Sequence, residues 1–241
     1  MLRSLLWFFL LIIYLIYLLP NMLAALFILA FRGKKQAHRF CFEVSRFACL
    51  RALAVGGIRV RIHGTENLPE DNFFILAPNH QGSFDAIVTL LALDRPYGFA
   101  AKKTLSFVPI AGLWFKILGA VFVSRNKRRS ANEIVKKCVG VLTSGEPLLI
   151  FPEGTRSKTG KINDIKTGVF RISFLTGAPV VPVIINGTRN AWEKNMKITP
   201  CEIEVKILPH VITVNDTSHS TLIRLKNELR EIYEKNLNQE K

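Results

Sequence analysis

The chain has 241 residues, of which 49% are hydrophobic, and its 33 lysines and arginines against 18 acidic residues give a formal net charge of +15. This length suits one substantial domain with an appendage, and the positive charge favours an anionic partner such as nucleic acid, an acidic membrane, or an acidic substrate or carrier. The usual nucleic-acid-binding classes are excluded, because the sequence has no paired metal-ligand cysteines, no aromatic RNA-binding strand and no obvious recognition helix. The four cysteines show no Cys-x-x-Cys spacing, and Cys41, Cys49 and Cys138 are predicted to be core thiols of a protein in a reducing compartment.

The amino terminus indicates that the partner is a membrane. The segment Leu5–Phe31 contains no charged residue, and basic residues flank it on both sides. A membrane-spanning helix needs about 20 apolar residues, but Pro20 and Asn21 divide this run, and proline breaks a helix interior. The preferred prediction is a hairpin of two short hydrophobic helices, within residues 1–35, that dips into one leaflet. A kinked helix that spans the membrane and a buried hairpin of a soluble protein are the alternatives.

The remaining residues, 36–241, are predicted to form one α/β domain. Apolar spacing predicts helices at 36–56, 83–93, 110–118, 128–143 and 165–176, and a final amphipathic helix with Leu222, Leu225, Leu229, Ile232 and Leu237 on one stripe. Strands are predicted at 58–64, 73–79, 97–102, 120–125, 147–153, 180–186 and 202–208. Because several strands are continuously apolar, we expect a mixed, largely parallel sheet of about seven strands sandwiched by helices. In such sheets the chemistry lies in the loops at the strand ends.

The stretch FILAPNHQGSFD, residues 74–85, begins as a buried strand and ends in a polar loop with a histidine and an aspartate. On one continuous helix His80 and Asp85 would be about 140° out of phase and could not meet. If His80 lies in the loop and Asp85 in the first turn of the next helix, the carboxylate can bond one ring nitrogen and leave the other to accept a proton. The alternative is a structural His–Asp pair that caps a helix. Ser83 is the nearby candidate nucleophile, but its position favours a helix N-cap.

A second apolar strand, in LLIFPEGTRS at residues 148–157, also ends in a polar turn. Glu153, Gly154, Thr155 and Arg156 follow its proline directly. The guanidinium of Arg156 offers a planar fork that suits phosphate, and the glycine permits a close backbone approach. A plain polar turn has a similar sequence, so this stretch alone leaves both interpretations open.

Two further strand ends carry cations. Arg125 ends the strand in GAVFVSR, and it precedes a basic cluster that is predicted to be mainly the exposed start of a helix. Lys102 and Lys103 stand at the end of the strand at 97–102. A His–Asp pair and several cations at strand ends together describe a base that faces a phosphate-bearing substrate. The sequence has no metal-ligand cluster, P-loop or dinucleotide fingerprint, so neither a metal nor a cofactor is predicted.

The last apolar strand before the carboxyl-terminal region, at 180–186, contains Pro182 and is followed by Gly187. Proline lacks an N–H for the sheet, and glycine allows another group to come close to the backbone. These two residues therefore suggest an edge strand or a close approach to a ligand.

Four segments, in this order, resemble the sequence boxes of the glycerolipid acyltransferases. NHQGSFD resembles their NHxxxxD box, GAVFVSR the second box around its arginine, FPEGTRS the third box throughout, and VVPVIING the fourth, so the resemblance covers residues 58–190. AAKKTL is similar to the family's lysine-containing segment, which favours Lys102 over Lys103, although Thr104 stands where an acid is expected. The size and the hydrophobic amino terminus are similar to those of bacterial members that acylate lysophosphatidate.

The resemblance implies that residues 36–241 are an acyltransferase domain and residues 1–35 a membrane-anchoring helical hairpin. It implies acyl transfer from acyl-ACP or acyl-CoA to the sn-2 hydroxyl of lysophosphatidate, with His80 as the general base and Asp85 as its orienting group. It implies a location at the cell membrane, among phospholipids, with the catalytic domain on the cytoplasmic face. The implied substrate-binding residues are Lys102, Arg125 and Arg156 for the phosphate, Glu153 and Gly154 for the glycerol, and Thr155 between them in the sequence.

Two alternative functions remain open at this stage. The nearer one is acyl transfer to another lysophospholipid or to a lyso-ornithine lipid, in which case a phosphate-free acceptor would not need Arg156. The more distant one is a non-catalytic membrane-bound scaffold protein. The presence of His80, Asp85, Glu153 and Arg156 together favours an enzyme.

Overall fold

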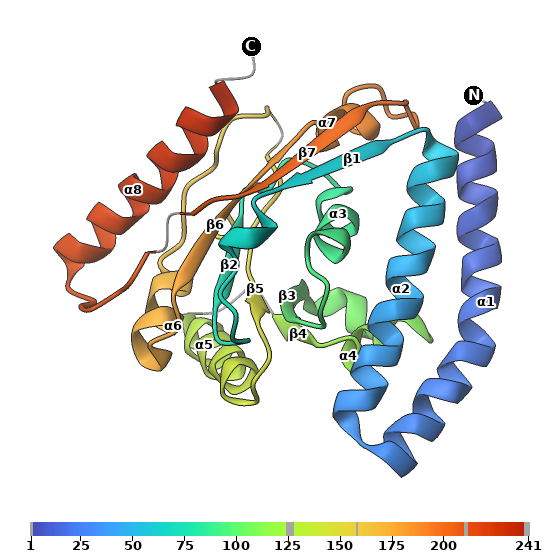
Figure 1. Cartoon of the computed structure of the whole chain (residues 1–241), viewed down its shortest axis with the longest axis horizontal. Helices are drawn as coiled ribbons and strands as arrows, with labels where there is room; N and C mark the ends of the chain where they lie inside the picture. The colour runs from blue at the N-terminus through green and yellow to red at the C-terminus, as the bar shows by residue number, and fades with distance from the viewer. Residues whose placement is uncertain (1, 124–127, 158, 210–211, 239–241) are drawn as a thin grey trace.

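A mixed sheet of seven strands lies at the centre of the structure (Figure 1). The structure is a computed structural model that describes all residues except 1, 124–127, 158, 210–211 and 239–241. The strand order is β1-β7-β6-β2-β5-β3-β4, and every neighbouring pair is parallel except the antiparallel pair β6–β7. The strands are β1 (Arg59–His63), β2 (Ile75–Pro78), β3 (Gly98–Lys102), β4 (Ala120–Val123), β5 (Leu148–Leu149), β6 (Val180–Asn186) and β7 (Glu202–Ile207). The predicted α/β fold with a largely parallel sheet is confirmed.

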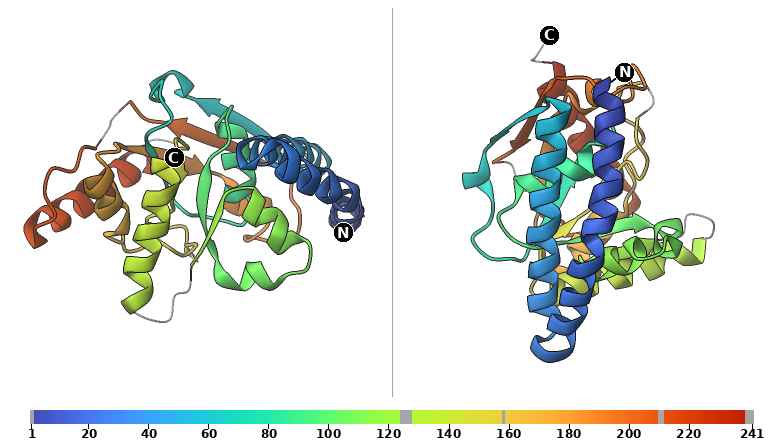
Figure 2. Two further views of the ribbon diagram at one scale, coloured as in Figure 1. Left: turned by 90° about the horizontal axis from the view of Figure 1, so that it is seen from below. Right: turned by 90° about the vertical axis from the view of Figure 1, so that its right-hand side faces the viewer.

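Helices cover both faces of this sheet, as Figure 2 shows. The helices are α1 (Leu2–Arg32), α2 (Lys34–Gly56), α3 (Asp85–Ala92), α4 (Ala111–Ile117), α5 (Arg128–Thr143), α6 (Gly168–Thr176), α7 (Thr188–Ala191) and α8 (His219–Asn238), with short 3₁₀ helices η1 (Thr65–Asn67) and η2 (Lys103–Phe107). α1 to α4 pack on one face, and α5, α6 and α8 pack on the other. The helices predicted from apolar spacing are therefore all present.

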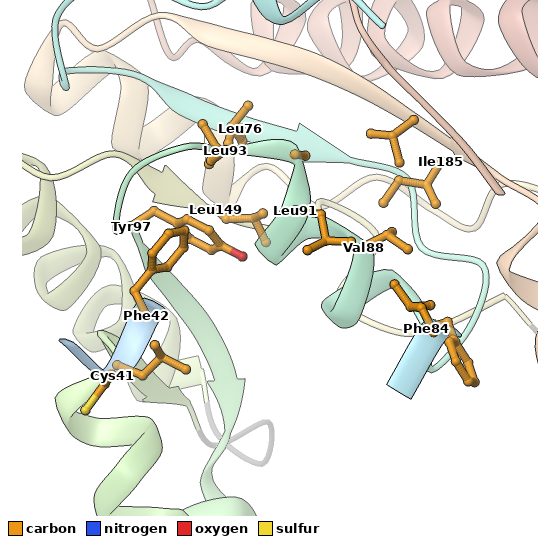
Figure 3. Close-up of a cluster of buried hydrophobic side chains, with 14 of the residues drawn as sticks. Cys41, Phe42, Leu76, Phe84, Val88, Leu91, Leu93, Tyr97, Leu149 and Ile185 are labelled. Atoms are coloured by element: carbon orange, nitrogen blue, oxygen red, sulfur yellow. The ribbon is translucent and has the colours of Figure 1, made fainter. Parts of the chain in front are cut away.

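The two-residue period of a strand explains why β2 and β6 are apolar throughout. In β2, Leu76 points into the core under α2 and α3, whereas Ile75 and Ala77 point into the core under α5, α6 and α8. Figure 3 shows the first of these cores, in which the rings of Phe42 and Tyr97 meet edge to face at 6.0 Å. Burying one such large apolar side chain stabilises the fold by about 1.5–3 kcal/mol relative to leaving it exposed.

The cysteines contribute to these cores as free thiols. Cys41 on α2 and Cys138 on α5 are fully buried, whereas Cys49 is only half-buried. Burial raises the pKa of Cys138 to about 12, because the thiolate would lose its hydration in the core. The prediction of small core residues is confirmed for these two thiols.

The N-terminal helical hairpin is present, but the predicted position of its turn is wrong. α1 continues through Pro20, and the chain turns instead at Gly33, whose φ of 85° suits glycine. Beside the proline, the Asn21 side chain donates a hydrogen bond to the carbonyl of Tyr17 at 2.8 Å, which partly replaces the backbone bonding that proline disturbs. Packing against α2 buries Leu18, Met22 and Ala25 on one side of α1, and this contact favours one continuous helix over two short ones.

One helix in the described part of the chain, Arg3–Arg32 of α1, is long and apolar enough to cross a membrane. Only 18% of its most apolar window is buried in the protein, which is consistent with membrane association. The division of the chain into an anchor of residues 1–35 and a catalytic domain of residues 36–241 stays a prediction.

The expectation of an edge strand at 180–186 is wrong, because β6 lies inside the sheet between β7 and β2. Pro182 still takes part in the sheet through its carbonyl, which accepts the N–H of Leu208 at 3.1 Å. Gly187 has a φ of 93°, and a Cβ atom there would lie 2.4 Å from the carbonyl oxygen of Glu202. The close approach at this glycine is therefore to the neighbouring strand β7 rather than to a ligand.

Candidate active site

The polar loops singled out from the sequence meet at one edge of the sheet. β2, β5 and β3 are parallel neighbours, so their carboxyl ends point the same way. His80 follows β2, Arg156 lies in the loop after β5, and Lys102 is the last residue of β3. The loops after β2 and β5 are joined directly, because the N–H of Ser157 donates to the carbonyl of His80 at 2.8 Å.

His80 and Asp85 form the pair that the sequence predicts. His80 lies in the loop after β2, Asp85 begins α3, and His80 Nδ1 is 2.6 Å from Asp85 Oδ2. The same carboxylate oxygen accepts the backbone N–H groups of Gln81 at 2.6 Å and Gly82 at 2.9 Å. Asp85 is fully buried, whereas the His80 side chain is 18% exposed. Because Nδ1 is bonded to the aspartate, Nε2 is the nitrogen of His80 that is left for a substrate.

Thr188 completes the environment of Asp85, and no sequence pattern pointed to this residue. Its hydroxyl donates to Asp85 Oδ1, so both oxygens of the carboxylate have donors. Thr188 is the first residue of α7, far along the chain, and Gly187 before it adopts the left-handed conformation that turns the chain out of β6. Asp85 is thus fixed from its own loop and from α7.

The imidazole of His80 stacks on Phe151. The ring centroids are 4.0 Å apart and the planes are inclined by 23°. Phe151 follows β5 in the segment LLIFPE, where it was predicted only as part of an apolar strand. Its ring fixes the orientation of the histidine from the face, while Asp85 fixes it from the edge.

Glu153 joins the loops that follow β2 and β5. Its Oε1 accepts the N–H of His80 and its Oε2 accepts the N–H of Asn163, both at 2.7 Å. Only 2% of the residue is exposed. Burial raises the pKa of Glu153, and the two amide hydrogen bonds act in the opposite direction. These contacts make Glu153 a group that positions the backbone of His80.

The neighbours of Glu153 lie at the surface. Gly154 has a φ of 67° and is exposed, so its backbone is accessible at a tight turn that favours glycine. Thr155 is also exposed, and its carbonyl accepts the side-chain amide of Asn163 at 3.1 Å. Both residues therefore present surface beside the His80 loop.

Arg156 lies against the loop between His80 and Asp85. Its Nη1 donates to the hydroxyl of Ser83, and the same atom is 3.3 Å from Glu193 Oε1.

The prediction that Ser83 caps α3 is wrong: Phe84 is the residue before the helix, and Asp85 accepts the loop amides in place of a serine cap. The hydroxyl of Ser83 instead donates to Glu193 at 2.7 Å. Glu193 was missed because it comes from a turn after α7 with no recognisable pattern.

Of the two other residues predicted to bind the phosphate, Lys102 and Arg125, the structure describes only Lys102. Lys102 is exposed at the end of β3, one strand beyond β5 from His80. Arg125 lies outside the described residues. The strand that precedes this region, β4, ends at Val123 and lies next to β3.

The fold and the site together define an α/β protein with an oriented histidine beside a phosphate-compatible arginine at the carboxyl edge of a parallel sheet. The sequence profile of the Acyltransferase family matches residues 59–186, which is more than half of the chain. The chain belongs to the acyltransferase family.

Individual relatives agree with this assignment. The chain is 39% identical over 128 residues to the chloroplastic 1-acyl-sn-glycerol-3-phosphate acyltransferase BAT2 of Brassica napus, an alignment that covers 53% of this chain and 37% of that protein. It is 31% identical over 159 residues to the 1-acyl-sn-glycerol-3-phosphate acyltransferase of Borreliella burgdorferi, covering 66% of this chain and 63% of that protein. The chain thus matches only part of the length of these relatives.

A solved structure matches over nearly the whole chain. The crystal structure of the 1-acyl-sn-glycerophosphate acyltransferase PlsC from Thermotoga maritima superposes with a TM-score of 0.79 and 26% sequence identity, and the match covers 99% of this chain and 96% of that one. The fold, including the packing of α1, α2 and α3, is therefore shared with PlsC.

Proposed function

We propose that the protein transfers an acyl group from an acyl thioester, acyl-ACP or acyl-CoA, to the sn-2 hydroxyl of 1-acylglycerol-3-phosphate, which gives phosphatidate. The observation that carries this proposal is the bond of 2.6 Å between His80 and Asp85 beside the guanidinium of Arg156. The printed names of the relatives support the acceptor, since each is a 1-acylglycerol-3-phosphate acyltransferase.

In this mechanism His80 is the general base. Its Nε2 accepts the proton of the acceptor hydroxyl while the hydroxyl oxygen attacks the thioester carbonyl carbon. The carbon–oxygen bond of the new ester forms, the carbon–sulfur bond breaks, and the proton passes from the imidazolium to the leaving thiolate. Asp85 stabilises the imidazolium and keeps the proton of neutral His80 on Nδ1. The hydroxyl of Ser83 donates to Glu193 rather than to His80, so the site favours direct transfer over a seryl intermediate.

The remaining side chains hold the acceptor. Arg156 binds the phosphate through its planar fork, and Lys102 adds positive charge from the end of β3, with Arg125 assigned to the same role from its sequence position. Gly154 and Thr155 shape the surface that meets the glycerol. Glu153 acts indirectly, by fixing the backbone of His80.

Radiolabelled acyl transfer tests this function most directly. Purified protein is mixed with acyl-ACP or acyl-CoA and, in parallel, with lysophosphatidate, a phosphodiester lysophospholipid, a lyso-ornithine lipid and a monoacylglycerol. We expect efficient labelling of lysophosphatidate alone, because only this acceptor presents a terminal phosphate to Arg156. Preferred labelling of another acceptor would change the acceptor that we assign but not the family. No transfer with either donor would favour a non-catalytic scaffold protein.

We infer that α1 and α2 lie in one leaflet of the cell membrane, with the catalytic domain on the cytoplasmic face, where both donors are found. One side of α1 packs on α2, and its other side exposes a row of large apolar side chains, namely Leu5, Phe9, Ile12, Ile16, Leu19, Leu23, Phe27 and Phe31. Arg32, Lys34 and Lys35 surround the turn at Gly33. A charged side chain at the bilayer centre costs about 2.5–3.5 kcal/mol on insertion scales, so this turn belongs at the headgroups.

Cysteine labelling in sealed vesicles is expected to place the turn and the catalytic domain on the same side. A single cysteine is introduced at exposed Lys35 or, as the reference, at exposed Lys161, in a protein whose Cys49 and Cys201 are replaced by serine. A membrane-impermeant maleimide should modify both positions from the same face. Labelling of position 35 from the opposite face would show that α1 spans the bilayer, and protection from both faces would place the turn in the hydrocarbon.

A further inference from the structure

Three hydrogen-bond donors converge on one oxygen of Glu193. Its Oε1 accepts the backbone N–H of Ser83 at 2.6 Å and the hydroxyl of Ser83 at 2.7 Å, and Arg156 Nη1 approaches it at 3.3 Å. The same Nη1 donates to the Ser83 oxygen, so the three donors form one connected cluster. A backbone N–H, a hydroxyl and a guanidinium that point to one atom are a binding site for an anionic oxygen.

The second oxygen of Glu193 has no such support. Among the residues that the structure describes, buried Oε2 has no hydrogen-bond partner. It sits against Gly82, where a Cβ atom would lie only 2.8 Å away, so the carboxylate occupies space that a glycine leaves open. A buried acceptor without a donor costs free energy. One oxygen of the Glu193 carboxylate is therefore stabilised by three donors, whereas the other has no donor among the described residues.

The cluster lies beside the residues to which we assign the reaction. Ser83 lies in the loop between His80 and Asp85, and the loop amides before it already bind Asp85. Arg156 is the residue to which we assign the acceptor phosphate, and its contact with Glu193 uses Nη1 alone. The other nitrogens of its fork are directed to no carboxylate in the described part of the chain.

We propose that Glu193 is an internal substitute for the acceptor's phosphate: Ser83 and Arg156 bind one phosphate oxygen at the point that Glu193 Oε1 occupies in this structure. This inference rests on the proposed function, because it takes the acceptor to be a phosphate monoester. A phosphate carries more charge than a carboxylate and has three free oxygens, so it can bond the Ser83 donors and the rest of the Arg156 fork together. Glu193 follows α7 and its side chain is 21% exposed, which leaves it a path to solvent.

Replacement of Glu193 by glutamine tests the substitution. The amide oxygen still accepts the N–H of Ser83, but the negative charge that competes with the phosphate is gone. Glycerol 3-phosphate serves as the probe, because it is soluble and carries the headgroup without the acyl chain. We expect E193Q to lower its inhibition constant, and the KM for lysophosphatidate, by about two- to fivefold, the range that partly exposed ion pairs contribute. Turnover of a phosphate-free monoacylglycerol should change far less, because this acceptor has no phosphate for the carboxylate to displace.

Two further variants complete the test. S83A removes one donor and is expected to weaken inhibition by glycerol 3-phosphate several-fold. In an R156A background the effect of E193Q on that inhibition should become smaller, because the carboxylate would then compete with the phosphate for the two Ser83 donors alone. E231Q, which removes an exposed acid from α8, is the control for the change in net charge and should leave all constants at their wild-type values.

The outcomes separate this inference from the proposed function. A higher KM for lysophosphatidate in E193Q, or an equal loss on both acceptors, would make Glu193 a structural partner of the loop and overturn the inference, while an acceptor-selective effect of R156A would still support the function. If R156A affects both acceptors equally, the phosphate role of Arg156 fails, and the inference fails with it.

Discussion

Replacing His80 with alanine is expected to reduce acyl transfer by a factor of about 10²–10⁴ or more, the contribution that a positioned general base makes. The methyl group cannot accept the hydroxyl proton, whereas the contacts of the His80 backbone with Glu153 and Ser157 remain. The side chain is partly exposed, so its loss should leave the protein folded. The measurement is the initial rate of transfer to lysophosphatidate, with thermal unfolding recorded on the same sample.

Two companion variants sharpen this experiment. Asp85→Asn should also be severe, because a neutral amide can stabilise the wrong tautomer of the histidine, and because it offers one acceptor oxygen where the structure uses two. His63→Ala is the matched control, since His63 is exposed on β1 and its partner is a glutamate on β7. Near-normal turnover in a folded His80→Ala protein would contradict the general-base mechanism, and a comparable loss in His63→Ala would show that the assay responds to stability.

Replacing Arg156 with alanine is expected to reduce the use of lysophosphatidate by about 10–100-fold. A hydrogen bond to a charged group contributes about 1.5–3 kcal/mol, and ~1.4 kcal/mol corresponds to a factor of ten. Monoacylglycerol, which lacks the phosphate, should be affected far less. Arg156→Lys should recover part of the loss, because an ammonium keeps the charge without the planar fork. The measured quantity is the ratio of kcat/KM for the two acceptors.

Arg61 provides the control for this second experiment. Its guanidinium is exposed at the edge of the sheet and pairs with Glu202 at 2.8 Å, away from the His80 loop. Arg61→Ala should keep the wild-type acceptor ratio. If Arg156→Ala lowers both acceptors equally in a folded protein, Arg156 stabilises the loop, and the phosphate contact passes to Lys102 and Arg125.

The sequence predicts the elements of this fold well because the residues that form them have strong local patterns. Continuous apolar strands such as β2 and β6, and the apolar stripe of α8, are decided by the period of burial. Pro20 misleads, because the local cost of a proline is outweighed by the contact of α1 with α2 along its length, which no local pattern records. Pro182 misleads for a similar reason: its carbonyl satisfies the one sheet bond that it can make, so it is accepted inside the sheet.

The candidate site is predictable where it is local in sequence and hidden where it is not. His80 and Asp85 are five positions apart, and a loop followed by a helix is enough to bring them together. Thr188, which begins α7, and Glu193, which follows it, reach the same loop through tertiary packing, and their residue types are common in turns. Glu153 stands next to the predicted phosphate-binding turn in the sequence, but its burial and its two backbone partners are set by the fold.

The first turns of α1 contact the His80 loop and the turn after α7 directly. Trp7 packs against Phe84, one residue before Asp85, and Phe8 meets Trp192, one residue before Glu193. Deleting α1 is therefore not a route to a soluble form of this protein, because the deletion would remove both aromatic contacts and uncover the apolar side of α2. The structure instead favours substitution of exposed apolar residues of α1 by polar ones, at Leu5, Phe9, Ile12 and Ile16. The buried residues Leu18, Met22 and Ala25, which pack against α2, would be kept.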